Sequence, residues 1–172
     1  MEESVASYKK AIDIKPNDVD SHYNLANTLK DMERFDDAMA SYRKAISIKP
    51  DFAEAHSNLG VVFKELGQLE DAIECYNQAL AIYPDYAEAH SNLGLAQQDL
   101  GLQDEAMESY RKALAINPQF AEVHSNLGLA LQDQGQVEEA MECYYKALEI
   151  KPDHAQAHNN LGLAFQELGQ MD

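Results

Sequence analysis

Five histidines recur at one fixed interval along the chain, and imidazole is a common metal ligand. They are His22, His56, His90, His124 and His158. A residue with this spacing occurs once in each copy of a repeated unit, and packed helices of neighbouring units lie about 8–10 Å apart. The ligands of one zinc ion each lie about 2 Å from the metal. Because the histidines are too far apart to share an ion, we predict that they pack in the core with a polar tip and that the chain holds no metal.

Asparagines with the same spacing offer a different chemistry, the binding of an extended peptide. A carboxamide carries both donors and an acceptor, so a row of asparagines can hydrogen-bond a peptide backbone with little regard to its sequence. The alternative is that each asparagine bonds a neighbouring helix or water. The candidate peptide-binding row consists of Asn24, Asn58, Asn92, Asn126 and Asn160.

Acidic and apolar residues recur beside the asparagines, and they would select side chains of such a peptide. Carboxylates favour Lys or Arg on the ligand, and aliphatic side chains accept apolar groups. The alternative for the aliphatic residues is that they seal one repeat against the next. The acidic candidates are Glu54, Glu88, Glu122, Asp99 and Asp133, and the apolar candidates are Val61, Leu95 and Leu129.

Catalytic motifs are absent from the sequence. We find no nucleophile elbow, phosphate-binding loop, dinucleotide fingerprint or cysteine–histidine metal motif. The candidate acids recur at the same period, whereas an active site is normally a unique constellation. We therefore predict a protein that is not an enzyme and that needs no cofactor.

The prolines recur at the same interval as the histidines, and this spacing indicates which structural elements position the candidate residues. A fixed period of about 34 residues indicates stacked supersecondary units. Apolar residues recur at helical spacing before Gly67 and again after it, so each unit contains two amphipathic helices. On the first helix, Leu59 and Phe63 share the core side, and Asn58 and Val61 lie on the opposite side. The prolines are Pro16, Pro50, Pro84, Pro118 and Pro152.

Helix boundaries are marked by acidic residues and glycines. Asp51 with Glu54, and Asp85 with Glu88, predict capped helix starts just after a proline. Glycines that tolerate positive φ are expected where the first helix reverses into the second. Glu33 breaks that column, so we predict that its turn is the most strained or irregular. The reversal glycines are Gly67, Gly101, Gly135 and Gly169.

The repeated residues resemble the tetratricopeptide repeat family, whose unit has the same period. A histidine stands where the family often has Trp or another large apolar residue. The resemblance implies an all-α fold, a tetratricopeptide-repeat α-solenoid that forms a right-handed superhelix of antiparallel helix pairs. In one complete repeat the matching residues are His56, Leu59, Gly60, Phe63, Gly67, Ala72, Tyr76, Ala79 and Pro84.

The repeat register divides the chain into a single array with partial repeats at both ends. Residues 1–18 match the second helix of a repeat, and residues 155–172 match a first helix with its turn. The array looks cut from a longer one, and we expect the terminal helices to stack head-to-tail between copies, with the helix near Ala155–Leu168 packing on Glu3–Ile14. The complete repeats are expected at 19–52, 53–86, 87–120 and 121–154.

Within the family, the repeats look most like those of O-linked N-acetylglucosamine transferases. This resemblance implies that the first helices line a concave face and that the five asparagines hold substrate peptides there. A clamp for a C-terminal carboxylate needs Lys or Arg, but Glu54 and Ser57 occupy those positions. Three functions therefore stay open: a scaffold that binds peptides, a self-assembling array, and the substrate-recruiting arm of a glycosyltransferase.

Charge and cysteine content set the expected surroundings. A formal net charge of −17 disfavours nucleic acid and anionic membranes as partners and is compatible with a basic protein or peptide partner. No apolar run approaches the roughly 20 residues that span a bilayer, and Met1 is followed by Glu2 and Glu3. Cys75 and Cys143 are two periods apart, too far for a disulfide. We predict free thiols and a cytoplasmic protein.

Overall fold

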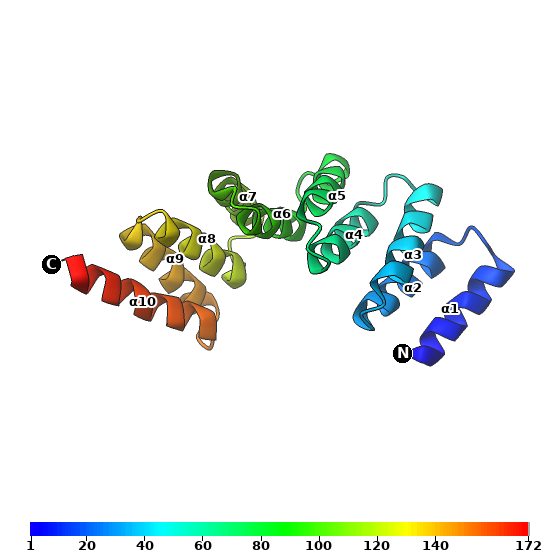
Figure 1. The fold of residues 1–172 in the computed structure, drawn as a ribbon, viewed down its shortest axis with the longest axis horizontal. Helices are drawn as coiled ribbons and strands as arrows, with labels where there is room; N and C mark the ends of the chain where they lie inside the picture. Colours follow the sequence, from blue (N-terminus) through cyan, green and yellow to red (C-terminus); the bar gives the residue numbers. More distant parts are fainter. Residues whose placement is uncertain (172) are drawn as a thin grey trace. The chain divides into compact units, whose positions relative to one another are not determined.

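The computed structural model describes the backbone of residues 1–171 and the side chains of residues 1–169, and it divides into two compact units. Unit 1 comprises Met1–Pro84, and unit 2 begins at Asp85. Every regular element among the described residues is an α-helix (Figure 1). The all-α prediction is therefore confirmed.

Unit 1 is built from antiparallel helix pairs. Helix α2 pairs with α3 and helix α4 pairs with α5, while α1 packs on α2 and α3 packs on α4. Short connections reverse the chain within each pair (Figure 1). The helices are α1 (Glu2–Ile14), α2 (Val19–Asp31), α3 (Phe35–Ile48), α4 (Ala53–Glu65) and α5 (Leu69–Ile82).

Unit 2 repeats this arrangement. Helix α6 pairs with α7 and helix α8 pairs with α9, while α7 packs on α8 and the last helix packs on α9. The helices are α6 (Ala87–Asp99), α7 (Gln103–Ile116), α8 (Ala121–Asp133), α9 (Val137–Ile150) and α10 (Ala155–Met171). Gly169 was predicted to sit in a reversal turn, but α10 continues through it, so that prediction is wrong.

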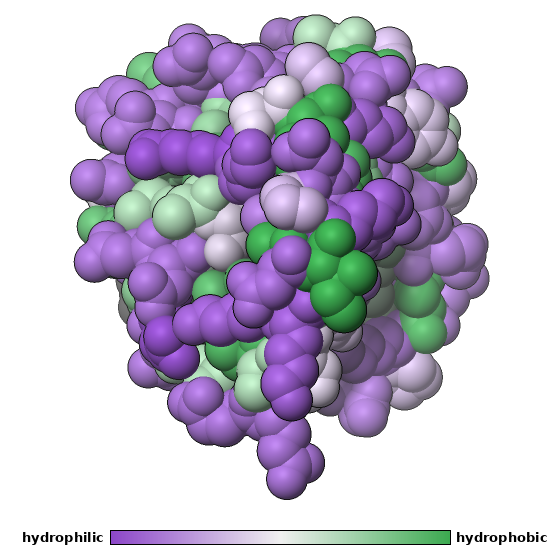
Figure 2. Space-filling model, turned by 90° about the vertical axis from the view of Figure 1, so that its right-hand side faces the viewer, coloured by the Kyte–Doolittle hydropathy of each residue, from purple (hydrophilic) through white to green (hydrophobic). Residues whose placement is uncertain are grey.

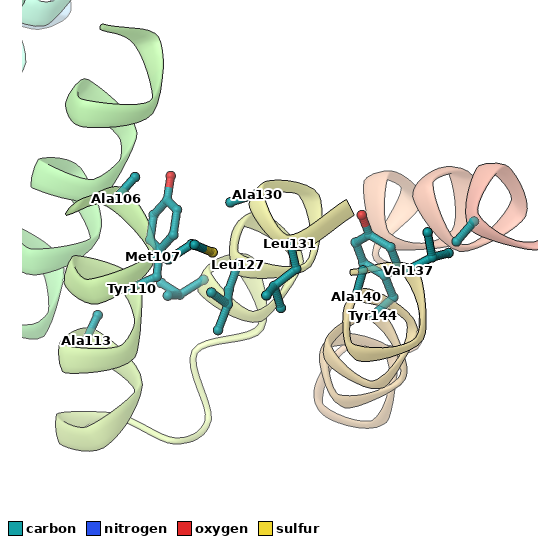
Figure 3. Close-up of a cluster of buried hydrophobic side chains, with 12 residues drawn as sticks. Ala106, Met107, Tyr110, Ala113, Leu127, Ala130, Leu131, Val137, Ala140 and Tyr144 are labelled. Carbon is teal, nitrogen blue, oxygen red and sulfur yellow. The ribbon is translucent and has the colours of Figure 1, made fainter. Parts of the chain in front are cut away.

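A buried tyrosine on each of the helices α3, α5, α7 and α9 forms the centre of the core. Tyr42, Tyr76, Tyr110 and Tyr144 are all fully buried. In unit 2 the rings of Tyr110 and Tyr144 come from α7 and α9, and Leu127 and Leu131 come from α8 between them (Figure 3). Burial of such large apolar groups is the main stabilising term in folding.

The turn at Glu33 is strained as predicted. Glu33 has φ +58°, and it is the one residue other than glycine with positive φ in the described part of the chain. The turn keeps regular hydrogen bonds, because Arg34 N–H donates to the Leu29 carbonyl just as Gln68 N–H donates to the Phe63 carbonyl, both at 2.9 Å. Gly67 occupies the equivalent position with φ +73°. The cost of Glu33 is therefore backbone strain and not a lost bond.

The predicted helix caps are wrong by one residue. Helix α4 begins at Ala53, so Phe52 is its N-cap and the Asp51 carboxylate lies too early to cap it. Likewise α6 begins at Ala87 and not after Asp85. Helix α2 has an aspartate one position later in the repeat: Asp18 accepts hydrogen bonds from the Ser21 backbone N–H (3.1 Å) and hydroxyl (2.7 Å). A carboxylate caps a helix only at this position.

The face of the molecule that Figure 2 shows is largely polar. Figure 2 looks onto the end of unit 1 that carries α1 and shows hydrophilic side chains around separate apolar patches. None of the helices in the described part combines the length and the apolar character needed to cross a membrane.

Candidate functional site

In unit 1 the asparagine predicted to bind peptide takes part in a hydrogen-bond network between first helices. Asn58 Nδ2 donates to the Tyr23 hydroxyl at 2.9 Å and to Asn27 Oδ1 at 3.1 Å. The Tyr42 hydroxyl donates to the same Asn27 oxygen at 2.5 Å. Both donors of Asn58 therefore hold α4 against α2, and its carboxamide oxygen is the atom left for a ligand.

The other asparagines of the row have different surroundings. Asn24, Asn92 and Asn126 are half-buried, and their carboxamides form no hydrogen bond within the described residues. Asn160 is buried, at 6% exposure, and its Nδ2 has no partner among those residues. Three of the five carboxamides are therefore open to a ligand, and Asn160 is not.

The carboxylates beside the row are mostly open to solvent. Glu54, Glu88, Asp99 and Asp133 are exposed and form no ion pair within the described part of the chain. Glu122 differs, because Lys151 Nζ donates to its Oε1 at 3.0 Å. This hydrogen bond is the main reason why the pKa of Glu122 is lowered. A basic ligand would have to displace Lys151 to reach Glu122.

The apolar candidates Val61, Leu95 and Leu129 are all half-buried. In unit 1 a cavity of about 260 Å³ opens beside Val61, between the C-terminal ends of α2 and α4. Among its charged residues, Lys30 Nζ lies 3.3 Å from Oδ1 of the adjacent Asp31. This cavity was not predicted from the sequence. Its one sequence signal is that two of the lining carboxylates, Asp31 and Glu65, are one period apart. The lining residues are Lys30, Asp31, Glu33, Phe35, Val61 and Glu65.

The profile of the TPR repeat matches the chain in overlapping segments. These segments are 1–33, 26–67, 62–101, 99–135 and 130–169. The chain belongs to the tetratricopeptide repeat (TPR) family. The TPR fold is a protein-interaction scaffold, because stacked repeats expose long continuous faces.

Solved structures with this TPR fold include MamA and YrrB. A crystal structure of MamA is 32% identical and covers 88% of this chain and 89% of that chain, with a TM-score of 0.81. MamA from Desulfovibrio magneticus RS-1 is 22% identical over 90% of this chain and 87% of that chain, with a TM-score of 0.81. YrrB, described as a TPR protein with an unusual peptide-binding site, is 24% identical over 94% and 84%, with a TM-score of 0.79. No curated protein sequence matches the chain.

The repeated TPR histidines bind backbone carbonyls. In four of the repeats the histidine Nε2 lies close to the carbonyl oxygen of the proline six residues earlier, at 2.9 Å for His22 and Pro16. The distance is 3.0 Å for the equivalent pair His56 and Pro50. Because a carbonyl oxygen only accepts, Nε2 carries the proton. The bond fixes the connection between repeats, and it recurs at His124 (3.0 Å) and His158 (2.9 Å).

The described part of the TPR array has no group of three or more His, Cys, Asp or Glu side chains placed to hold a metal ion. Both cysteines are free thiols, and Cys75 is buried while Cys143 is half-buried. Burial is the main cause that raises the pKa of each thiol to about 11. Such thiols are weak nucleophiles at neutral pH.

Proposed function

We propose that this TPR protein is a non-catalytic scaffold that binds extended peptide segments along the first helices of its repeats. The observation that carries the proposal is the open carboxamide of Asn92. On α6, Glu88, Asn92, Leu95 and Asp99 follow one another at helical spacing, so they share one face. This face offers a donor, an acceptor, an apolar contact and two unpaired carboxylates.

The preferred peptide is basic. The exposed carboxylates of Glu88 and Asp99 have no cation within the described residues, so Lys or Arg on a peptide would supply one. The net charge of −17 adds a long-range attraction for such a peptide. The description of YrrB supports peptide binding as a use of this fold.

The test is fluorescence anisotropy with labelled unstructured peptides of basic, neutral and acidic composition. We expect basic peptides to bind most tightly, and Asn92→Ala with Asn126→Ala to weaken binding at least tenfold. The matched control is Asn159→Ala, which removes an exposed carboxamide one position away from the row. Unchanged binding by the double variant would contradict the proposal.

A second candidate function is self-association through the terminal helices. Gly60, Gly94 and Gly128 each contact a tyrosine ring, whereas nothing lies within 4 Å of a Cβ built on Gly162. On the same helix α10, Leu163 is 50% and Phe165 is 53% exposed. Tyr8 on α1 occupies the repeat position of the buried tyrosines and is half-buried. A second copy could therefore place Tyr8 against Gly162.

Sedimentation equilibrium over a range of concentrations tests this candidate. We expect the mean molar mass to rise with concentration, and Gly162→Leu to keep the chain monomeric because the slot is filled. A wild-type chain that stays monomeric at high concentration would exclude head-to-tail stacking. That result would leave the peptide proposal untouched, because the two experiments probe different residues.

A further inference from the structure

A cavity of about 450 Å³ lies in unit 2, and none of the residues of the proposed peptide face lines it. It opens between the second helices α7 and α9, and α8 forms its floor. Leu114 comes from α7. Leu127 comes from α8, and Figure 3 shows it among the buried side chains of the core. The residues that line it are Leu114, His124, Leu127, Glu142, Cys143, Tyr145, Lys146 and Glu149.

An equivalent cavity of about 400 Å³ occurs in unit 1. Ile12 matches Leu114 and Ser41 matches Cys143, and the members of each pair are three periods of the repeat apart. The cavity is therefore a product of the repeat geometry, and the residues that vary between copies give each one its own chemistry. The unit 1 residues are Lys9, Ile12, Asp13, His22, Leu25, Ala40, Ser41 and Lys44.

The unit 2 cavity combines an apolar floor with a fixed hydrogen-bond acceptor. Leu114, Leu127 and the Cys143 thiol supply the apolar surface. His124 lies at the wall, and its Nε2 donates to the Pro118 carbonyl at 3.0 Å. Because that carbonyl requires a proton on Nε2, Nδ1 of the neutral ring is an acceptor.

The rim of the unit 2 cavity carries more negative than positive charge. Glu149 pairs with Lys146 at 2.7 Å, while Glu142 forms no ion pair among the described residues. Arg111 of α7 acts electrostatically on the nearby Cys143 thiol but does not line the cavity. The unit 1 cavity has Ala40 at the position of Glu142, and its rim carries two lysines and one aspartate.

We propose that the unit 2 cavity is a second peptide site, which takes an apolar side chain such as leucine from a segment with Lys or Arg beside it. The apolar floor stabilises the leucine by removing it from water. Glu142 and His124 Nδ1 then accept hydrogen bonds from the flanking basic group. A single anchor of this kind binds weakly, so the site would act together with other contacts.

Cys143 provides a direct reporter, because it lines the cavity. In a Cys75→Ala background it is the single thiol of the chain, and its alkylation by iodoacetamide at pH 8.5 can be followed by mass spectrometry. Three short capped peptides serve as probes: a leucine flanked by arginines, a leucine flanked by glutamates, and a serine flanked by arginines. We expect the first peptide at millimolar concentration to slow alkylation at least threefold and the other two to leave the rate unchanged.

Two charge variants sharpen the test. Glu142→Lys should abolish the protection, and Ala40→Lys, which introduces a lysine at the equivalent unit 1 position, should leave it intact. Protection should also persist in the Asn92→Ala, Asn126→Ala variant, which separates this site from the proposed peptide face. Equal protection by the glutamate-flanked peptide, protection that survives Glu142→Lys, protection lost with the asparagine variant, or no protection by any peptide would each overturn the proposal. Circular dichroism of every variant establishes that it is folded.

Discussion

The ring of Tyr76 lies against the backbone of Gly60, so closely that a Cβ built on residue 60 would stand 2.7 Å from Cε1 of that ring. The same contact recurs between Gly94 and Tyr110 at 2.6 Å. Real Cβ atoms do not come this close to another heavy atom without displacing it. Gly60 and Gly94 are therefore required by the close approach of the partner helix and not by their backbone angles.

Gly60→Ala should destabilise the chain, because the added methyl group forces the buried Tyr76 ring to move. Overpacking of this kind costs about 1–3 kcal/mol. The matched control is Gly162→Ala, since a Cβ there meets nothing within 4 Å, and alanine in a helix is about 0.5–1 kcal/mol better than glycine. Urea unfolding followed by circular dichroism measures both changes. Equal loss of stability in the two variants would contradict the contact.

The tyrosine hydroxyls should differ in their contribution to stability. Tyr42 OH donates to Asn27, whereas Tyr76 OH is buried without a partner in the described part of the chain, and Val61 stands at the position of Asn27. Tyr42→Phe should lower the free energy of unfolding by about 1 kcal/mol, and Tyr76→Phe should leave it unchanged or raise it. Thermal unfolding of both variants makes the comparison. A larger loss at Tyr76 would show that its hydroxyl has a partner.

Glu33→Gly should stabilise the first complete hairpin. Glu33 has φ +58°, a conformation that glycine adopts without strain. The expected gain is about 0.5–1 kcal/mol, because the greater freedom of glycine in the unfolded chain offsets part of the relieved strain. Chemical unfolding measures the gain. Gly67→Ala, at the equivalent turn, should have the opposite sign, and a loss of stability in Glu33→Gly would refute the strain argument.

Helix α2 should lose stability in acid because of Asp18. Hydrogen bonds from Lys15 and then from Ser21 lower the pKa of Asp18 to about 2 from a usual value of 3.8. A lowered pKa in the folded state means that the ionised form stabilises the fold above about pH 4, and that this contribution is lost as the pH falls towards 2.

Asp18→Asn tests this contribution, because asparagine keeps the cap but not the charge. The variant should be less stable than the wild type at pH 7 and should match it near pH 2. Unfolding curves across this pH range measure the difference. A difference between the two chains that does not depend on pH would show that the carboxylate charge has no role.

Periodicity predicts most of the fold and less of the site. The helix pairs, the buried tyrosines and the strained turn at Glu33 all follow from residues that repeat or fail to repeat. The partners of Asn58 do not, because Tyr23 and Asn27 are replaced by Ser57 and Val61 one period later. These hydrogen bonds depend on side chains that one repeat has and the next lacks. The pattern shared by all repeats therefore does not predict them.

The helix caps, the cavities and one ion pair were not predicted correctly, because they depend on exact helix boundaries and on contacts between helices. A shift of one residue separates Asp51, which caps nothing, from Asp18, which does. The cavities on the second helices form where three helices meet, so their residues are spread over the sequence without a motif. The pairing of Glu122 with Lys151 joins residues that are nearly one period apart.

The hydrogen bond from histidine to the preceding proline carbonyl has a consequence for how such a chain changes length. Four of the connections use the same donor and the same acceptor, six residues apart, on the two sides of the connection. Duplication or deletion of one whole repeat by unequal genetic exchange at these connections therefore rejoins a compatible donor and acceptor. The number of repeats can therefore change during evolution by whole repeats, and the hydrogen bond across the connection is kept.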